Sequence, residues 1–342
     1  MTGPRAVALG GGHGLYATLS ALRLLTDDVT AVVTVADDGG SSGRLRGELG
    51  ILPPGDLRMA LAALAAGTDA SARLRELFQH RFGGTGALAG HAVGNLLLAG
   101  LIELLGDPVA ALDEACTLLG VSGRVLPMSV QPLVIEAEVT GLGPDPELVS
   151  RIRGQVAVAS TPGRVRRVWL QPRVPTACPQ ALEAIRHAEV VLLGPGSWFT
   201  SVLPHVLVPE LHQALLDTPA RRVLVLNLAP QPGETEGFSP EQHLEVLAEH
   251  APELRIDTVL ADEHSVPVPD LLARSAAALG ARAVLAPVGQ PDGSPRHNPA
   301  ALADAVRSVL DGGAGRIGGT RIRWVGGVTR AARGREENTR WR

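Results

Sequence analysis

The chain contains no lysine, so all 31 of its basic residues are arginines. This absence excludes a Walker-type phosphate-binding lysine, a Schiff-base lysine and a lysine general base. Recognition of a phosphate therefore falls to backbone N–H groups and to the planar, always charged guanidinium of arginine.

Aromatic residues and cysteines are also scarce. Trp, Tyr and Phe make up 3% of the 342 residues, and the formal net charge is −4. A nucleic-acid-binding surface needs a basic patch, often with aromatic side chains, so we expect no nucleic acid partner. Cys116 and Cys178 lie outside any CxxC spacing. They are therefore expected to be buried apolar side chains and not part of a zinc site or a disulfide framework.

Long hydrophobic runs are missing too. No apolar run approaches the roughly 18 residues of a membrane-spanning helix, and the one near the N-terminus is too short for the core of a signal peptide. We therefore expect a cytoplasmic protein without a transmembrane segment. The length favours one large domain, residues 1–311, with a β-rich insertion or lid at about 124–175. The Gly- and Arg-rich remainder, 312–342, is expected to add a short strand and to be disordered from Arg330 onward.

The first informative stretch begins with an apolar run, Ala6 to Leu9, followed by five residues of which four are glycines. Leucines at helical spacing come next, so the pattern predicts a strand, a tight turn and a helix. Glycines let the backbone approach a ligand, and a helix start aims free N–H groups at an anion. A plain turn without a ligand is the alternative. The residues predicted to bind a phosphate here are Gly10, Gly11, Gly12, His13 and Gly14.

A second apolar strand, Thr30 to Val35, ends in two carboxylates. It places them at the C-terminal edge of a parallel sheet, where open α/β sheets bind ligands. Asp56, further on, is expected either to join them or to act as the N-cap of a helix through Ala66. The ligand-binding residues predicted here are Asp37, Asp38, Ser41, Ser42, Arg44, Asp56 and Arg58. Asp37, Asp38 and Asp56 are also candidates to hold Mg²⁺ through their oxygens.

At these residues the chain resembles a known family. The phrases GGGHGL, VADDGGSSGRLR and LPPGDLR are similar to the signature of CofD-like proteins of the YvcK type, the gluconeogenesis factors, and the likeness runs from Ala6 to about Leu310. The resemblance implies a regulatory protein that binds a UDP-sugar, such as UDP-N-acetylglucosamine or UDP-glucose. It also implies a role in cell shape and wall synthesis during gluconeogenic growth.

Two later segments carry further candidates. His91 and Asn95 are expected one turn apart on a helix that runs to about Leu105, where His91 either faces the ligand or makes a structural hydrogen bond. After the strand Val190 to Leu193 comes a second loop rich in glycine and hydroxyl groups. Its predicted ligand-binding residues are Gly194, Gly196, Ser197, Thr200 and Ser201. Within it, Trp198 and Phe199 either stack on a base or anchor the loop in the core.

The strand Arg222 to Leu226 leads into the last family phrases. Asn227, Gln231 and Glu234 match the family phrase N-x-x-x-Q-x-G-E-T. Arg296 matches the start of a second phrase, Arg-His-Asp-Pro. There its guanidinium either binds a phosphate with two parallel hydrogen bonds or is a solvated charge. The chain departs from the family at three places: Arg153-Gly154-Gln155 replaces Gly-Glu-Ser, Ala229-Pro230 replaces Met-Thr, and Asn298 replaces Asp.

Three functions stay open at this point. The first is the UDP-sugar-binding regulator without a catalytic residue. The second is a metal-dependent transferase similar to 2-phospho-L-lactate transferase, in which paired acids hold a divalent ion against a phosphate. The third is an NAD-dependent oxidoreductase, because Gly12 begins a G-x-G-x-x-A phrase and Asp37 ends the second strand. Against it, a polar loop follows Asp37 and no hydride-transfer base stands out.

The patterns together predict an α/β fold, a Rossmann-like, doubly wound and mostly parallel sheet. Cell-wall synthesis proteins and a second copy of the chain are possible partners under the family resemblance. The sequence decides neither of them.

Overall fold

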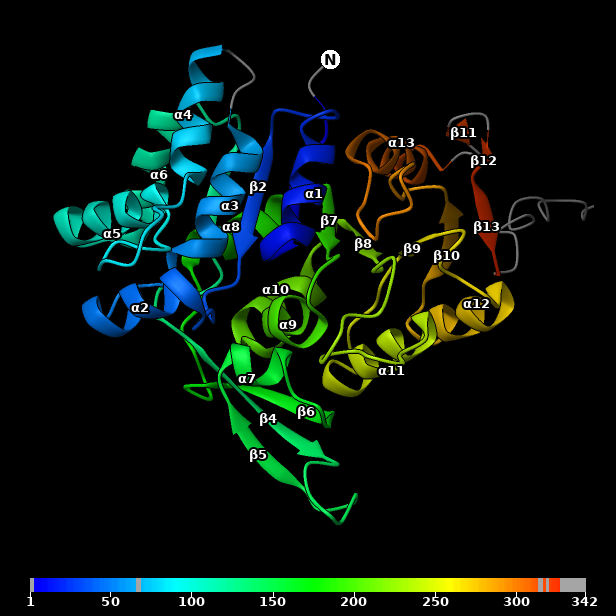
Figure 1. The fold of residues 1–342 in the computed structure, drawn as a ribbon. Helices are drawn as coiled ribbons and strands as arrows, with labels where there is room; N and C mark the ends of the chain where they lie inside the picture. The colour runs from blue at the N-terminus through cyan, green and yellow to red at the C-terminus, as the bar shows by residue number, and fades with distance from the viewer. Residues whose placement is uncertain (1–2, 66–68, 313–315, 318–319, 327–342) are drawn as a thin grey trace, which may run out of the picture.

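An eight-stranded sheet forms the centre of the computed structural model, which describes residues 3–65, 69–312, 316–317 and 320–326 (Figure 1). All neighbouring strands run parallel except the last pair, β10 and β13. From one edge to the other, the strands are β13 (Arg323–Val325), β10 (Arg282–Ala286), β9 (Thr258–Asp262), β8 (Arg221–Val225), β7 (Val190–Leu193), β1 (Ala6–Gly10), β2 (Val29–Val33) and β3 (Arg124–Pro127).

The middle strands are buried on both faces. Every residue of β1, β7 and β9 is buried, and Leu9 pairs with Val32 on one side and with Leu193 on the other. A strand covered on both faces needs apolar side chains at successive positions, which is why the central residues of these strands are apolar without alternation.

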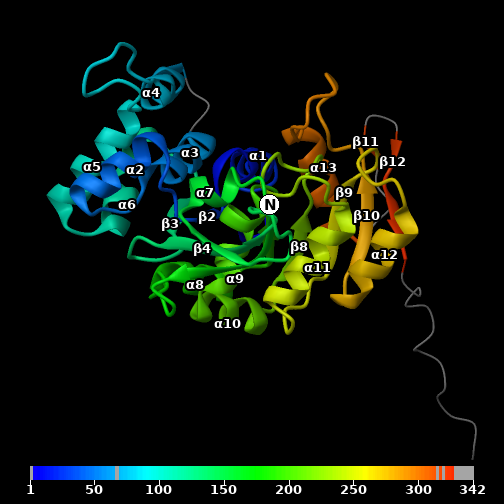
Figure 2. The ribbon, with the colours of Figure 1, turned by 60° about the horizontal axis from the view of Figure 1, so that its bottom comes forward.

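Helices cover both faces of the sheet, as Figures 1 and 2 show. On one face α1 (Gly12–Leu22) packs between α3 (Pro54–Leu64) and α13 (Pro299–Leu310). On the other face α8 (Pro179–His187) packs on α10 (Pro209–Asp217), and α11 (Pro240–His250) on α12 (Pro269–Ala278). The predicted doubly wound, mostly parallel α/β fold is therefore confirmed.

Two groups of elements extend from this frame. Between β2 and β3 lie α2 (Gly40–Leu49), α4 (Asp69–Gln79), α5 (Val93–Leu105) and α6 (Pro108–Leu119). Between β3 and α8 lies an antiparallel sheet of β5 (Ser150–Arg153), β4 (Val134–Thr140) and β6 (Arg164–Gln171), with α7 (Gln155–Ala159). The elements η1 (Trp198–Val202), a π-helical turn, and α9 (Leu203–Leu207) follow β7, and β11 (Arg316–Ile317) pairs with β12 (Thr320–Arg321).

Three local predictions were wrong. The polar segment after Asp37 is not a loop, because helix α2 begins at Gly40. Asp56 is not an N-cap, because α3 begins two residues earlier at Pro54, whose fixed φ and missing N–H suit the first helical position. His91 precedes α5 and is not in it, because Ala92 is extended and bridges Arg81. The disorder predicted for 330–342 lies outside the described residues. Within the described part of the chain, no helix has the length and apolar character needed to cross a membrane.

Candidate functional site

The two glycine loops meet where the sheet changes its direction of winding. β1 and β7 are neighbouring strands, but the helix α1 that follows β1 and the helix α10 that follows β7 lie on opposite faces of the sheet. The loops after the two strands therefore start side by side and lead to opposite faces. Such a switch point, at the carboxyl ends of the strands, is where open α/β sheets bind ligands. A Cβ on Gly14 would lie 2.1 Å from the carbonyl oxygen of Pro195, so the loops are in direct contact.

The glycines of the first loop have different roles. A Cβ on Gly11 would lie 2.5 Å from Oδ2 of Asp56, so this position, like Gly14, is glycine because its neighbours pack so closely. Gly12 has φ +57°, and a Cβ there would meet nothing nearer than Oδ1 of Asp56 at 4.0 Å. A ligand can therefore approach this turn at Gly12, where the N-cap residue of α1, Gly11, has no side chain to cap the helix.

Asp56 already lies at the start of α1. Its carboxylate accepts a hydrogen bond from the backbone N–H of Gly12. Burial, with the neighbouring charge of Asp37 second, raises the pKa of Asp56 to about 7, although the Gly12 bond and Arg58 act in the opposite direction. The acid therefore gains or loses its proton near neutral pH.

The two carboxylates after β2 point to different places. Asp37 stays near Asp56 and accepts a hydrogen bond from the backbone of Gly39 at 2.9 Å. Asp38 instead accepts from the backbone N–H of Val156 at 3.0 Å, at the start of α7. No three His, Cys, Asp or Glu side chains of the described residues gather closely enough to hold a metal ion. The three predicted metal ligands therefore do not form one cluster, because α7 binds one of them.

A chain of buried hydrogen bonds joins four predicted residues. Nε of Arg58 donates to Oδ1 of Asn95 at 2.8 Å, and Nδ2 of Asn95 donates to Oγ of Ser41 at 2.9 Å. Oγ of Ser41 lies 2.9 Å from Nδ1 of His91. Burial, followed by the charge of Arg44, lowers the pKa of His91. The structure thus brings α2, α3 and α5 together through side chains that the sequence placed on separate segments.

Two more predicted residues of this region lie beside the chain of bonds. Ser42 is buried, and a Cβ on Gly55 would lie 2.3 Å from its Oγ. Arg44 is exposed and donates to the backbone oxygen of Ala89 at 2.7 Å, so it holds the loop that precedes His91.

The second loop is held by its own polar side chains. Oγ of Ser197 is hydrogen-bonded to Thr200 and to the carboxylate of Glu234. Oε1 of Glu234 accepts from the backbone N–H groups of Phe199 at 2.7 Å and Thr200 at 3.0 Å, and burial raises its pKa. Asn227 donates to the carbonyl of Gly196 and accepts from its N–H, at 2.8 and 2.9 Å. These residues form a scaffold that fixes the loop.

The aromatic pair of this loop is fully buried. Trp198 and Phe199 both have 0% exposure, and they meet His243 and Phe238 edge to face, with ring centroids 5.1 and 6.2 Å apart. Of the two alternatives, anchoring is therefore correct, and neither ring is available to stack on a base.

A pocket of about 720 Å³ lies at the carboxyl ends of β8, β9 and β10, on the same side of the sheet as the two glycine loops. Asp262 lies at its base, where the carboxylate accepts from the backbone N–H groups of His264, Val288 and Gly289. Arg296 is on the neighbouring loop, exposed, with Asp292 at 3.4 Å and Ser294 at 3.2 Å as its contacts. The structure does not bring Arg296 against the first glycine loop.

Sequence reasoning missed several polar groups of this edge. Asp262 ends a buried strand just as the predicted acids follow β2, so the same pattern could have found it. Thr34 and Gln155, which the sequence did not single out as site residues, have buried side-chain oxygens without a hydrogen-bond partner among the described residues, and so does the predicted Gln231. Thr34 borders the Gly11 turn, since a Cβ on Gly11 would lie 2.6 Å from its Cγ2. Unpaired buried acceptors and hydroxyls are costly unless a ligand or water completes them.

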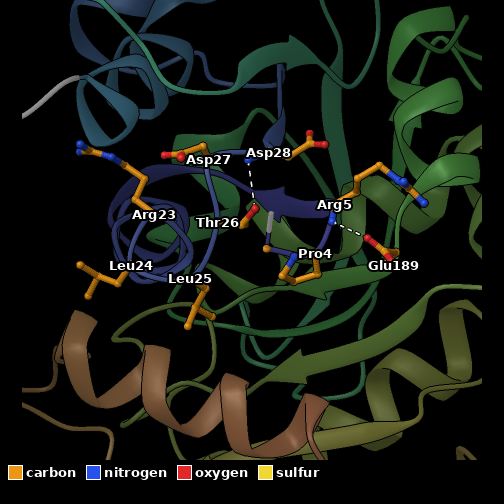
Figure 3. Close-up of a pocket in the computed structure, with 10 residues that line it drawn as sticks. Pro4, Arg5, Arg23, Leu24, Leu25, Thr26, Asp27, Asp28 and Glu189 are labelled. Carbon is orange, nitrogen blue, oxygen red and sulfur yellow. Dashed lines mark hydrogen bonds between the residues drawn. The ribbon is translucent and has the colours of Figure 1, made fainter. Parts of the chain in front are cut away.

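A larger pocket lies at the amino ends of the strands, on the side of the sheet opposite to the glycine loops (Figure 3). It measures about 920 Å³ and is lined by residues at the amino ends of β1, β2 and β7, among them Arg5, Asp28 and Glu189. Arg5 donates its backbone N–H to Glu189 at 2.9 Å, as Figure 3 shows. Ligands of doubly wound sheets bind at the carboxyl ends of the strands, so we do not place the site there.

Comparison with known proteins identifies the family of the chain. Residues 6–285 match the family model described as 2-phospho-L-lactate transferase CofD. The gluconeogenesis factor of Bacillus subtilis is 40% identical over 264 residues, which cover 77% of this chain and 80% of the relative. A Mycobacterium tuberculosis relative that carries this name provisionally is 60% identical over 309 residues, 90% of this chain and 89% of its own. A crystal structure of a UPF0052 family member from Bacillus halodurans superposes with a TM-score of 0.80 at 35% identity, covering 90% of this chain and 99% of that one.

Proposed function

The chain belongs to the CofD family, and from that premise we propose that it is a regulatory protein that binds a UDP-sugar. The observation that carries the proposal is the open approach to Gly12 at the start of α1, at the switch point of the sheet. Backbone N–H groups and the helix dipole favour the diphosphate at this place. The name of the relatives supports a role in gluconeogenic growth.

The pocket beyond β8 to β10 supports an extended ligand. It lies on the same edge of the sheet as Gly12, and β9 is three strands from β1, about 14 Å at the usual spacing. Such a distance suits a nucleotide sugar, with its diphosphate at one end, and exceeds the reach of a free phosphate. On this proposal UDP-N-acetylglucosamine or UDP-glucose is the ligand, and cell-wall synthesis proteins in the cytoplasm are the partners.

A binding function without turnover is favoured by the state of the candidate bases. His13 is exposed on the first turn of α1, and His91 is engaged by Ser41. General-base catalysis requires a free group within hydrogen-bond reach of the proton it removes.

Isothermal titration of the purified protein with UDP-N-acetylglucosamine, UDP-glucose and NADH tests the proposal. Saturable binding of a UDP-sugar is the expected result. Binding of NADH alone would replace the proposal with the oxidoreductase, and binding of neither would reject both.

A second function, the metal-dependent transferase, is favoured by one observation. Asp37 lies close enough to Asp56 for its charge to raise the pKa of Asp56, and a carboxylate at either position would repel a diphosphate at Gly12. Mg²⁺ is commonly held by one or two carboxylates together with substrate phosphates, so these two acids fit it. Bound there, the ion would neutralise phosphate charge. We expect Mg²⁺ to strengthen UDP-sugar binding to the wild type and not to Asp37→Asn, and equal effects on the two would exclude the site.

A further inference from the structure

The chain of bonds from Arg58 to His91 has a defined donor direction at every step. A guanidinium only donates hydrogen bonds, so the atom of Asn95 that faces Nε of Arg58 must be its oxygen. The amide nitrogen of Asn95 then faces Ser41 and donates to its hydroxyl oxygen. The orientation of the Asn95 amide is thus set by Arg58.

The next hydrogen bond, between Ser41 and His91, has the same donor direction. The hydroxyl oxygen of Ser41 accepts from Asn95, and its own proton has one other partner within hydrogen-bond distance among the described residues, Nδ1 of His91 at 2.9 Å. Burial and the positive charges of Arg44 and Arg81 lower the pKa of the ring, although Glu48 acts in the opposite direction, and a lowered pKa favours the neutral imidazole. A neutral imidazole that accepts at Nδ1 carries its proton on Nε2.

Nε2 of His91 has no partner among the residues that the structure describes. The residue is 6% exposed, and its Nε2 is not one of the fully enclosed unpaired side-chain atoms, so this nitrogen reaches the surface although the ring is almost enclosed. A fixed, uncharged N–H donor in this position recognises an acceptor such as a phosphate oxygen, and the buried bonds behind it prevent the ring from turning its lone pair outward.

We propose that Arg58, Asn95 and Ser41 form a relay that locks His91 as the Nε2–H tautomer, and that this N–H binds an oxygen of the ligand's diphosphate. Asn95 and Ser41 are positioning residues, because they act through His91. The inference that a diphosphate is the partner rests on the proposed function, whereas the tautomer does not.

His250 provides an internal reference with the opposite tautomer. Its Nδ1 donates to the carbonyl of Val246 at 2.8 Å, and its Nε2 accepts from the backbone N–H of Val168 at 3.2 Å. Long-range ¹H–¹⁵N NMR of the ligand-free protein should therefore find the His91 proton on Nε2 and the His250 proton on Nδ1, with the His91 signals assigned from His91→Phe. A His91 proton on Nδ1 would overturn the relay.

The variant Asn95→Asp reverses the relay. A carboxylate only accepts, so it takes the N–H of Arg58 and the hydroxyl proton of Ser41. Nδ1 of His91 then donates to Ser41, Nε2 becomes an acceptor, and affinity for UDP-N-acetylglucosamine should fall about tenfold or more. His250 should not change. If His91 keeps its tautomer in this variant, the relay is rejected.

Two uncharged variants test whether a loss of affinity in Asn95→Asp comes from the reversed relay and not from the added charge or from misfolding. Ser41→Ala removes the donor to Nδ1 without a charge, and it should weaken binding by a smaller factor than Asn95→Asp. His91→Gln retains an N–H donor and should bind better than His91→Phe, provided that both melt at the wild-type temperature. Equal affinity of His91→Phe and the wild type would overturn the contact with the ligand.

Pyrophosphate makes the test independent of the UDP-sugar. If UDP-N-acetylglucosamine does not bind but pyrophosphate shifts the Nε2–H resonance of His91, the relay is supported and the proposed function fails. If neither molecule shifts that resonance, the inference itself is wrong.

Discussion

The backbone N–H of Gly12 donates a hydrogen bond to the carboxylate of Asp56, so an acid from α3 occupies the first free N–H group of α1. A phosphate at this turn would compete with the carboxylate or share a cation with it. The ionisation of Asp56 and the binding of an anion are therefore coupled.

Replacing Gly12 should affect stability and binding together. Gly12→Ala forces a side chain into the left-handed region, at a cost of roughly 1–2 kcal/mol, and places a methyl group where the ligand approaches. Gly106→Ala is the matched control, because Gly106 has φ +66°, open space around it and a position at the end of α5. Urea unfolding should show similar losses in both variants, and calorimetry a loss of UDP-sugar affinity in Gly12→Ala alone. Unchanged affinity in folded Gly12→Ala would remove Gly12 from the site.

Replacing Gly14 should affect stability. Its new Cβ would lie 2.1 Å from a backbone oxygen of the second loop, so Gly14→Ala should destabilise by about 1–3 kcal/mol or more. Gly47→Ala, inside α2 with nothing within 4 Å, should instead stabilise by roughly 0.5–1 kcal/mol. Chemical unfolding of the two variants measures the difference, and a neutral Gly14→Ala would mean that the loops do not touch.

Asp56 should make stability depend on pH. Its pKa is about 7 in the folded chain and near the ordinary 3.8 when unfolded, so the folded state binds the extra proton between these values. Stability from this group is therefore present below pH 4 and is lost as the pH rises to 7, by on the order of 4 kcal/mol. Asp56→Asn should flatten the profile of unfolding free energy measured in EDTA. A wild-type profile that rises through this window relative to Asp56→Asn would contradict the sign.

Arg296 provides a test of the predicted phosphate fork. If its guanidinium leaves Asp292 for the diphosphate, Arg296→Ala should cost roughly 1.5–3 kcal/mol of binding, the range of a charged hydrogen bond. Arg307→Ala is the matched control, an exposed arginine paired with Asp304 on α13. Equal affinities of the two variants in a calorimetric titration would leave Arg296 as a solvated charge.

The protein should bind a UDP-sugar without consuming it. Transfer or hydrolysis needs a positioned acceptor and a general base within reach of it. Of the two candidate histidines, His91 is engaged by Ser41, and His13 is exposed on the first turn of α1. Phosphorus NMR of protein incubated with Mg²⁺, a UDP-sugar and phosphorylated small acids should show no release of UDP or UMP. Sustained release that disappears in Asp37→Asn would make the protein a transferase.

The sequence by itself determined the order of the elements. Short apolar runs such as Val190–Leu193 that end in glycine favour strands buried on both faces, with a turn after them. These signals are local, because burial and backbone sterics act within a few residues. They were enough to predict the doubly wound sheet and the two loops that meet at its edge.

Only the tertiary structure decided which way each polar side chain points. Asp37 and Asp38 are adjacent in sequence, yet one lies near Asp56 and the other binds the start of α7, a segment 118 residues away. Ser41 and His91 meet because α2 packs on α5, and nothing in their spacing indicates it. A short side chain can bond only to a partner that long-range packing brings within about 3 Å. The sequence therefore indicates the candidate residues, and the tertiary structure determines their contacts.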